Sequence, residues 1–231
     1  MAKHGKNYQN ARGKVEEAVL SPMQGFEKVK DASFAKFDES IDVDVNLGID
    51  PAKGEQVVRG SVVLPHSLGR KARVVVFAKD KYAEQAEAAG ADEVGSTDLI
   101  EKIAGGWLDF DYAVATPDMM GAVGKLAKAL GPKGLLPNKK LGTVTFDVGP
   151  IVEDLKMGRS FFKNDKTGIV HFAIGKKSFA VDKLNDNLQA FFKALISARP
   201  NTAKGKYIQK VSISSTMGPG VKIDCEDLLK S

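Results

Sequence analysis

Apolar and polar residues alternate from Ile41 to Leu47, with Asp42, Asp44 and Asn46 at the polar positions. A period of two residues predicts a strand with one buried face and one solvated face. Less regular versions of the same alternation predict further strands over residues 56–64, 167–174 and 208–215.

Two helices are predicted beside these strands. Ser21-Pro22-Met23-Gln24 is a capping box with proline at the first helical position, and it predicts a helix over residues 22–33. Apolar residues at helical spacing predict a longer helix that begins near Leu184 and ends at Arg199-Pro200. Strands with one solvated face, together with helices to cover the other face, are typical of a two-layer α+β domain.

The middle of the chain follows a different pattern. Arg73 to Ala78 is a continuous apolar run after its first residue, as expected for a strand buried on both faces of a parallel sheet. Predicted helices then alternate with predicted strands. The helices are expected over residues 80–89, 96–104, from 118 onward and 149–158, and the strands over 91–94 and 111–115. This order predicts a Rossmann-like three-layer α/β domain over residues 69–159, inserted into a discontinuous α+β domain of residues 1–68 and 160–231.

Positive charge is unevenly distributed between these two predicted domains. The 231-residue chain has 34 Lys+Arg and 29 Asp+Glu, a net charge of +5. Residues 69–159 hold 13 of each, so the whole excess belongs to the discontinuous domain. Residues 199–222 include five basic residues and no acidic one. Such a stripe attracts phosphates through counterion release, although a solvated surface accounts for the charge equally well.

Neither cysteine content nor hydropathy points to an exported or membrane protein. Cys225 is the single cysteine, so no internal disulfide is available, and no apolar run approaches the ~20 residues that span a bilayer. We therefore expect a cytoplasmic protein that does not enter the membrane.

The motifs of common enzymes are missing from the sequence. Residues 78–82, which follow the first buried strand, contain no glycine, whereas a dinucleotide site needs G-x-G-x-x-G there. His4, His66 and His171 have no partner at catalytic or metal-binding spacing, and the acidic neighbours of Cys225 disfavour a thiolate. We expect no catalytic residue, no metal and no cofactor. The alternative is a nucleotide-dependent enzyme that uses the α/β insert, which the missing phosphate loop disfavours.

Four stretches carry groups suited to RNA. Phe34-Ala35-Lys36-Phe37-Asp38 puts aromatic rings beside a cation, and these rings either belong to the core or stack on a base. Ser214 to Gly220 either offers hydroxyl and N–H groups to phosphates and ribose 2′-hydroxyls, or is simply a strand end with a turn. Lys163 to Gly168 is a polar turn. Gly131 to Lys140 is a long loop whose two leucines are predicted to be exposed as a contact surface.

Long blocks of the sequence resemble one family, in that family's order. They are Met120 to Asn138 (MGAVGKLAKALGPKGLLPN), Ala35 to Ser40 (AKFDES), Gln56 to Gly60 (QVVRG), Val63 to His66 (VLPH), Asn164 to Gly168 (NDKTG) and Thr216 to Pro219 (TMGP). The chain is similar to the family of the bacterial large-subunit ribosomal protein L-one, the protein of the mobile stalk. One segment departs from the family, since Ser67-Leu68-Gly69 stands where Gly-Thr-Gly is usual, in a predicted connection between the domains.

The resemblance implies a function as well as a fold. The discontinuous domain would bind the stalk region of 23S rRNA, and the inserted domain would make a secondary contact. The protein would also assist release of deacylated tRNA from the exit site and repress translation of its own operon by binding the mRNA. The free protein would be a monomer. Carried over position by position, the RNA-binding residues would be Glu27, Lys36, Phe37, Ser40, His171, Lys176, Thr216, Met217 and Gly218. The residue pattern by itself marks Phe37 and the turn at 216–218, but neither Glu27 nor His171.

Overall fold

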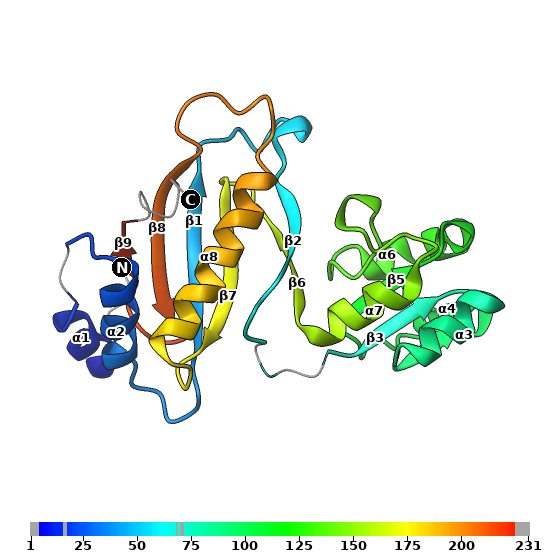
Figure 1. The fold of residues 1–231 in the computed structure, drawn as a ribbon, viewed down its shortest axis with the longest axis horizontal. Coiled ribbons are helices and arrows are strands. Elements are labelled where there is room, and N and C mark those ends of the chain that lie inside the picture. The colour runs from blue at the N-terminus through cyan, green and yellow to red at the C-terminus, as the bar shows by residue number, and fades with distance from the viewer. Residues whose placement is uncertain (1–4, 16–17, 68, 70–71, 225–231) are drawn as a thin grey trace. The chain divides into compact units, whose positions relative to one another are not determined.

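The computed structural model describes residues 5–15, 18–67, 69 and 72–224, and its elements are shown in Figure 1. The fold is a mixed α+β one with several sheets. Contacts within the chain define two compact units: the first comprises Met1–Leu68 and Phe161–Ser231, and the second comprises Gly69–Ser160. Leu68, at one predicted crossing between the domains, lies outside the described residues. Among the described residues, no helix is both long enough and apolar enough to cross a membrane.

The first unit is organised around an antiparallel sheet. Its strands are β1 (Ser40–Leu47), β7 (Ile169–Lys176), β8 (Ile208–Ser215) and β9 (Val221–Ile223), in the order β7-β1-β8-β9. The alternation predicted for β1 is confirmed, because its apolar positions are buried and its polar positions are half-buried. Strand β1 lies between β7 and β8, so both of its neighbours come from the far end of the chain.

Two helices pack on the apolar face of this sheet. Helix α2 (Pro22–Ala32) begins with the predicted capping box, in which Ser21 and Gln24 exchange side-chain and backbone hydrogen bonds. Gly25 lets α2 lie close to the sheet, because a Cβ atom there would stand 2.6 Å from Ile223 Cγ2. Helix α8 (Val181–Ser197) is the predicted long helix, and its apolar residues except the exposed Ile196 point into the same core.

Aromatic rings fill the core between α8 and the sheet. The rings of Phe172 and Phe191 stack with centroids 4.5 Å apart, and Phe162 meets both of them edge-on. All three side chains are almost completely buried. Offset stacked and edge-on rings are favourable arrangements for aromatic pairs, so this cluster holds α8 in place on the sheet.

Several short elements of the first unit were not predicted. They are α1 (Lys6–Gly13), β6 (Arg159–Lys163) and β9. Strand β2 (Arg59–Val63) is shorter than the predicted 56–64, because Gly54–Gln56 forms a turn of 3-10 helix, and it pairs with β6 in a separate two-stranded sheet. Strands of three to five residues contain too few alternations to be recognised by period alone.

The second unit has a parallel sheet. Strand β3 (Val74–Phe77) lies between β4 (Glu93–Gly95) and β5 (Tyr112–Ala115), and all of its residues are buried, as predicted. Helices α3 (Lys81–Ala88), α4 (Thr97–Ala104) and α7 (Val148–Met157) belong to this unit. The helix predicted from 118 onward is instead broken into α5 (Met120–Val123) and α6 (Ala127–Leu130), separated and preceded by 3-10 turns. Gly121 and Gly124 weaken a continuous helix there.

Replacing Phe191 with alanine should destabilise the first unit by about 3–5 kcal/mol, because it removes a ring that contacts Phe162 and Phe172 and leaves a cavity. Ile196→Ala is a matched control on the same helix, since that side chain is 38% exposed, and it should cost less than about 1 kcal/mol. Hydrogen exchange of the β1 amides measures the stability of the first unit. Trp107 fluorescence measures the stability of the second unit separately. Equal costs for the two variants would contradict this account of the core.

Candidate nucleic-acid interface

A buried carboxylate joins the exit of α2 to the turn that follows β8. Glu39 is fully buried. Its Oε1 accepts the backbone N–H of Ala35 at 2.8 Å, and its Oε2 accepts the backbone N–H of Met217 at 3.1 Å. The backbone oxygen of Glu39 accepts the N–H of Lys177 at 2.8 Å. One residue therefore ties together three segments that are distant in the sequence.

The electrostatics of Glu39 favour its ionised form. Burial of the carboxyl opposes ionisation, but the Ser215 hydroxyl, the N–H groups of Ala35 and Met217 and the charge of Lys177 outweigh it. Together they hold the pKa of Glu39 below its ordinary value of 4.5. The charged carboxylate is thus the form that organises this end of the sheet at neutral pH.

Ser40 and Thr216 form a second connection beside Glu39. The backbone N–H of Ser40 donates to Thr216 Oγ1 at 3.0 Å, and the backbone N–H of Thr216 donates to the backbone oxygen of Ser40 at 3.1 Å. Lys176 Nζ donates to Ser40 Oγ at 2.8 Å. The turn continues to Gly218, whose N–H donates to the backbone oxygen of Ser215. A Cβ atom added at Gly218 would stand only 2.5 Å from Ser215 Oγ, so a larger residue would not fit there. The structure therefore brings Ser40, Lys176 and Thr216 into one network.

Two large apolar side chains are exposed next to this network. Phe37 is 56% exposed and Met217 is 52% exposed. Phe34 is also exposed, so the possibility that Phe34 and Phe37 belong to the core is wrong. Lys36, which lies between Phe34 and Phe37 in the sequence, is exposed as well. We call the group formed by Lys36, Phe37, Ser40, Lys176, Thr216, Met217 and Gly218 the sheet-end surface.

The two remaining predicted residues lie away from that network. His171 stands on β7 opposite Asp44, and Asp44 lies four residues along β1 from Ser40, which is ~13 Å. Its Nδ1 is 2.5 Å from Asp44 Oδ1. Glu27 is exposed on α2, and among the described residues no hydrogen bond or ion pair connects it to the sheet-end surface. The structure thus joins seven of the nine predicted residues at one place.

The face of the sheet opposite α2 and α8 carries acidic groups near its centre. Asp42 and Asp44 project from β1 on this face, and His171 lies beside them on β7. Burial raises the pKa of Asp42, and the neighbouring charge of Asp44 raises it further, whereas Lys176 and His171 act in the opposite direction. These carboxylates repel phosphates, so the centre of this face is less suited to RNA than its end.

One of the five cations in residues 199–222 makes its contacts within its own loop. Arg199 Nη2 donates to the backbone oxygens of Ala203 and Gly205 at 3.1 and 3.2 Å, and the guanidinium lies over the Tyr207 ring. This arginine therefore holds its own loop. The four other cations of the stretch are exposed: Lys204, Lys206, Lys210 and Lys222.

The two other stretches marked in the sequence have structural roles. In the turn at 163–168, buried Asn164 accepts the Val58 N–H at 2.9 Å and joins β2 to β6. Hydrogen bonds from Thr167 and the Ile169 N–H lower the pKa of Asp165 to about 2. In the loop at 131–140, the predicted exposure is wrong, because Leu135 and Leu136 are half-buried against the core of the second unit.

The sequence analysis did not select Glu39 itself. The sequence does contain a signal for its burial. Residue 39 is separated by even numbers of residues from Ile41 and Val43, so in an extended chain it lies on the same, buried face as they do. A carboxylate at a buried position needs hydrogen-bond donors around it. That pattern predicts a partnered buried acid, although it does not say which segments supply the donors.

Among the described residues, no group of three or more His, Cys, Asp or Glu side chains could hold a metal ion. His66 lies in a structural contact, with its N–H donating to Asn187 Oδ1 and its ring 3.2 Å from Asp186. His4 and Cys225 lie outside the described residues.

A hydrogen-bonded polar turn with exposed apolar side chains and nearby cations has the composition that nucleic-acid-binding surfaces use. Comparison of the sequence with family models gives the particular family: residues 29–219 match the ribosomal protein L1p/L10e family. The match covers most of the chain, so the chain belongs to this family. It is therefore a ribosomal protein of the large subunit that binds rRNA, in a family of structural rather than enzymatic proteins.

Replacing Glu39 with glutamine should weaken the first unit by about 1–3 kcal/mol, because one amide oxygen cannot accept both N–H groups. The stabilisation from Glu39 is fully present above its unfolded pKa, which is near 4.5, and is lost as pH falls through the lower folded pKa. As pH falls below about 4.5, the variant should therefore lose less stability than the parent.

Glu55→Gln is the control, since Glu55 is an exposed carboxylate in the same unit. Urea denaturation at a series of pH values, followed by hydrogen exchange of β1, measures both effects. If Glu39→Gln kept the parent's pH dependence, the role assigned to the Glu39 carboxylate would be wrong.

Proposed function

We propose that the discontinuous domain, residues 1–68 and 160–231, binds the stalk region of 23S rRNA through the sheet-end surface. Glu27 and His171 would extend the contact along α2 and β7. The observation that carries this proposal is the Glu39 network, which fixes the turn at 216–218 against the exit of α2 while Phe37 and Met217 remain exposed. A surface fixed in advance loses little conformational entropy on binding.

Each part of the sheet-end surface suits a different group of the RNA. The exposed Phe37 ring provides a face for an unstacked base, and Met217 provides a soft apolar contact beside it. Lys36 and Lys176 supply positive charge for phosphates. The backbone and hydroxyl groups of the turn at 216–218 can exchange hydrogen bonds with ribose 2′-hydroxyls. Recognition would depend on the shape of the RNA more than on its base sequence.

The wider role that we propose follows from membership of the family. The protein would form the mobile stalk of a bacterial large subunit and assist release of deacylated tRNA from the exit site. Residues 69–159 would act as a Rossmann-like three-layer insert that makes a secondary RNA contact. Two chain crossings between the domains would permit hinge closure while restricting twist. The free protein would be a cytoplasmic monomer.

A regulatory role belongs to the same proposal. The protein would repress translation of its own operon by binding an mRNA site that imitates the ribosomal one. Both RNAs would then use the sheet-end surface and compete for it.

Phe37→Ala and Met217→Ala should each weaken binding of a stalk rRNA fragment, because each removes an exposed apolar contact at the centre of the surface. Loss of base stacking costs about 1–3 kcal/mol, which is about 5- to 150-fold in Kd for Phe37→Ala. Filter binding or fluorescence anisotropy at fixed salt measures the change.

Val63→Ala is the control, since Val63 is a 47% exposed apolar side chain of the first unit but lies on β2, in the separate two-stranded sheet. Parent-like affinity for both Phe37→Ala and Met217→Ala would refute the sheet-end surface as the binding site.

An unlabelled mRNA leader from the protein's own operon should displace the rRNA fragment, and Met217→Ala should weaken both complexes by similar factors. The protein should also sediment with large subunits. If the leader failed to compete, the regulatory proposal would be rejected and the ribosomal one would stand.

A further inference from the structure

The loop that carries Phe37 is held at its base and at its tip by different contacts. At the base, the Ala35 N–H donates to Glu39 Oε1 and closes the loop. At the tip, Asp38 Oδ1 accepts the backbone N–H of Ser178 at 3.1 Å, and Asp38 Oδ2 accepts the Ser178 hydroxyl at 2.8 Å. We call these two hydrogen bonds between Asp38 and Ser178 the tip clasp.

Ser178 is a fixed point of attachment for the tip clasp. It lies in the connection between β7 and α8, and both of its neighbours in the chain are held to the rest of the first unit. The Lys177 N–H donates to the Glu39 backbone oxygen at 2.8 Å, and the Phe179 oxygen accepts a hydrogen bond from Lys30 Nζ at 2.6 Å. The Phe179 ring also packs against the core. The clasp therefore ends on a part of the chain that is itself held in place.

Asp38 is the side chain that supports the tip of the loop. Among the described residues, no hydrogen bond or ion pair involves the side chain of Lys36, and no ring contact holds Phe37, which is 56% exposed. The rotamers open to an exposed ring depend on the backbone that carries it. The direction in which Phe37 points therefore depends on how firmly its neighbour Asp38 is held.

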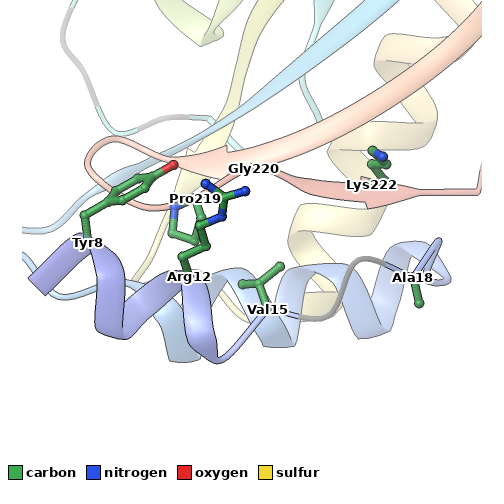
Figure 2. Close-up of a pocket in the computed structure, with 7 residues that line it drawn as sticks. All are labelled: Tyr8, Arg12, Val15, Ala18, Pro219, Gly220 and Lys222. Carbon is green, nitrogen blue, oxygen red and sulfur yellow. The ribbon is translucent and has the colours of Figure 1, made fainter. Parts of the chain in front are cut away.

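The turn after β8, the other part of the sheet-end surface, has supports of its own. It is bonded to the start of β1 through Thr216. Figure 2 shows Pro219 and Gly220, further along this turn, beside Tyr8 of α1, with which they line a groove. Loss of the tip clasp should therefore loosen the loop that carries Phe37 and leave this turn in place.

The charge of Asp38 opposes RNA binding. Lys36 and Lys176 supply cations to the sheet-end surface, whereas Asp38 is an exposed carboxylate next to Phe37 in the chain. A carboxylate at this position repels phosphates. Any benefit of Asp38 to RNA binding must therefore come from the clasp and not from its charge.

We propose that Asp38 is a positioning residue for RNA binding. Through Ser178 it holds the tip of the loop, so that the Phe37 ring is presented for stacking before the RNA arrives. Less conformational freedom is then lost when a base stacks on the ring. This inference rests on the proposed function and adds to it a residue that does not itself touch the RNA.

Two variants of Asp38 remove the same charge and differ in the clasp. Asp38→Asn keeps it, because the amide oxygen accepts the Ser178 N–H and the amide N–H donates to the Ser178 hydroxyl oxygen. Asp38→Ala loses both bonds. Fluorescence anisotropy with the full chain and a stalk rRNA fragment at fixed salt should give a Kd about 2- to 12-fold weaker for Asp38→Ala than for Asp38→Asn, which is the cost of ordering one side chain on binding. Charge alone predicts equal affinities, and that result would overturn the proposal.

A second comparison asks whether Asp38 acts through the Phe37 ring. In the Phe37→Ala background, Asp38→Ala and Asp38→Asn should bind the RNA equally, because no ring remains to be placed. If the difference between them kept its full size in that background, Asp38 would act by another route and the positioning role would be wrong.

Nitrogen-15 relaxation of the free protein measures the loosening directly. The order parameters of the Lys36 and Phe37 amides should fall below about 0.6 in Asp38→Ala and keep the parent values in Asp38→Asn. Unchanged values in Asp38→Ala would contradict the proposal. Ser178→Ala keeps the carboxylate and removes only the hydroxyl bond, so it should show a smaller fall and a smaller loss of affinity. Should Asp38→Ala fail to fold, Ser178→Ala is compared with the parent in its place.

The outcomes separate this proposal from the one on which it rests. If Phe37→Ala weakens binding while Asp38→Ala and Asp38→Asn bind alike, the clasp has no positioning role and the sheet-end surface stands. If Phe37→Ala and Met217→Ala both bind like the parent, the sheet-end surface itself fails, and the role of Asp38 fails with it.

Discussion

The buried Glu39 carboxylate is the constraint on which this end of the molecule depends. Burying an ionised carboxyl without partners costs several kcal/mol, so Ala35 and Met217 must keep their N–H groups directed at it. This requirement fixes the exit of α2 and the turn after β8 relative to each other. The same bonds that stabilise the fold therefore shape the surface that we assign to RNA, and stability and recognition cannot be altered independently at residue 39.

The predictability of each element follows from the range of the interactions that form it. The alternation in β1, the capping box of α2 and the apolar run of β3 are local patterns, and all three elements are present. Strand β9 and helix α1 were missed because they are short and depend on contacts with distant segments. The half-buried leucines at 135 and 136 were expected to be exposed, since the core that covers them is assembled from other parts of the second unit.

The candidate site was predictable in composition but not in arrangement. Phe37 and the turn at 216–218 could be selected from residue types alone. Their proximity depends on hydrogen bonds between residues 176 to 178 positions apart, which no local pattern encodes. Charge was also an incomplete guide, because Arg199 holds its own loop and the Asp42–Asp44 pair makes the middle of the polar sheet face unfavourable for phosphates.

The position of β1 between β7 and β8 has a consequence for how the chain is made. Every residue that pairs with β1 is synthesised more than 120 residues later. At ~5–20 residues per second, roughly 6 to 24 seconds pass before this strand can find a partner. During that interval its row of Ile41, Val43, Val45 and Leu47 has no sheet to join, whereas the parallel sheet of residues 74–115 can already form. Until β7 and β8 are synthesised, the nascent chain therefore contains an apolar strand without its partners, which is the kind of segment that is prone to aggregate.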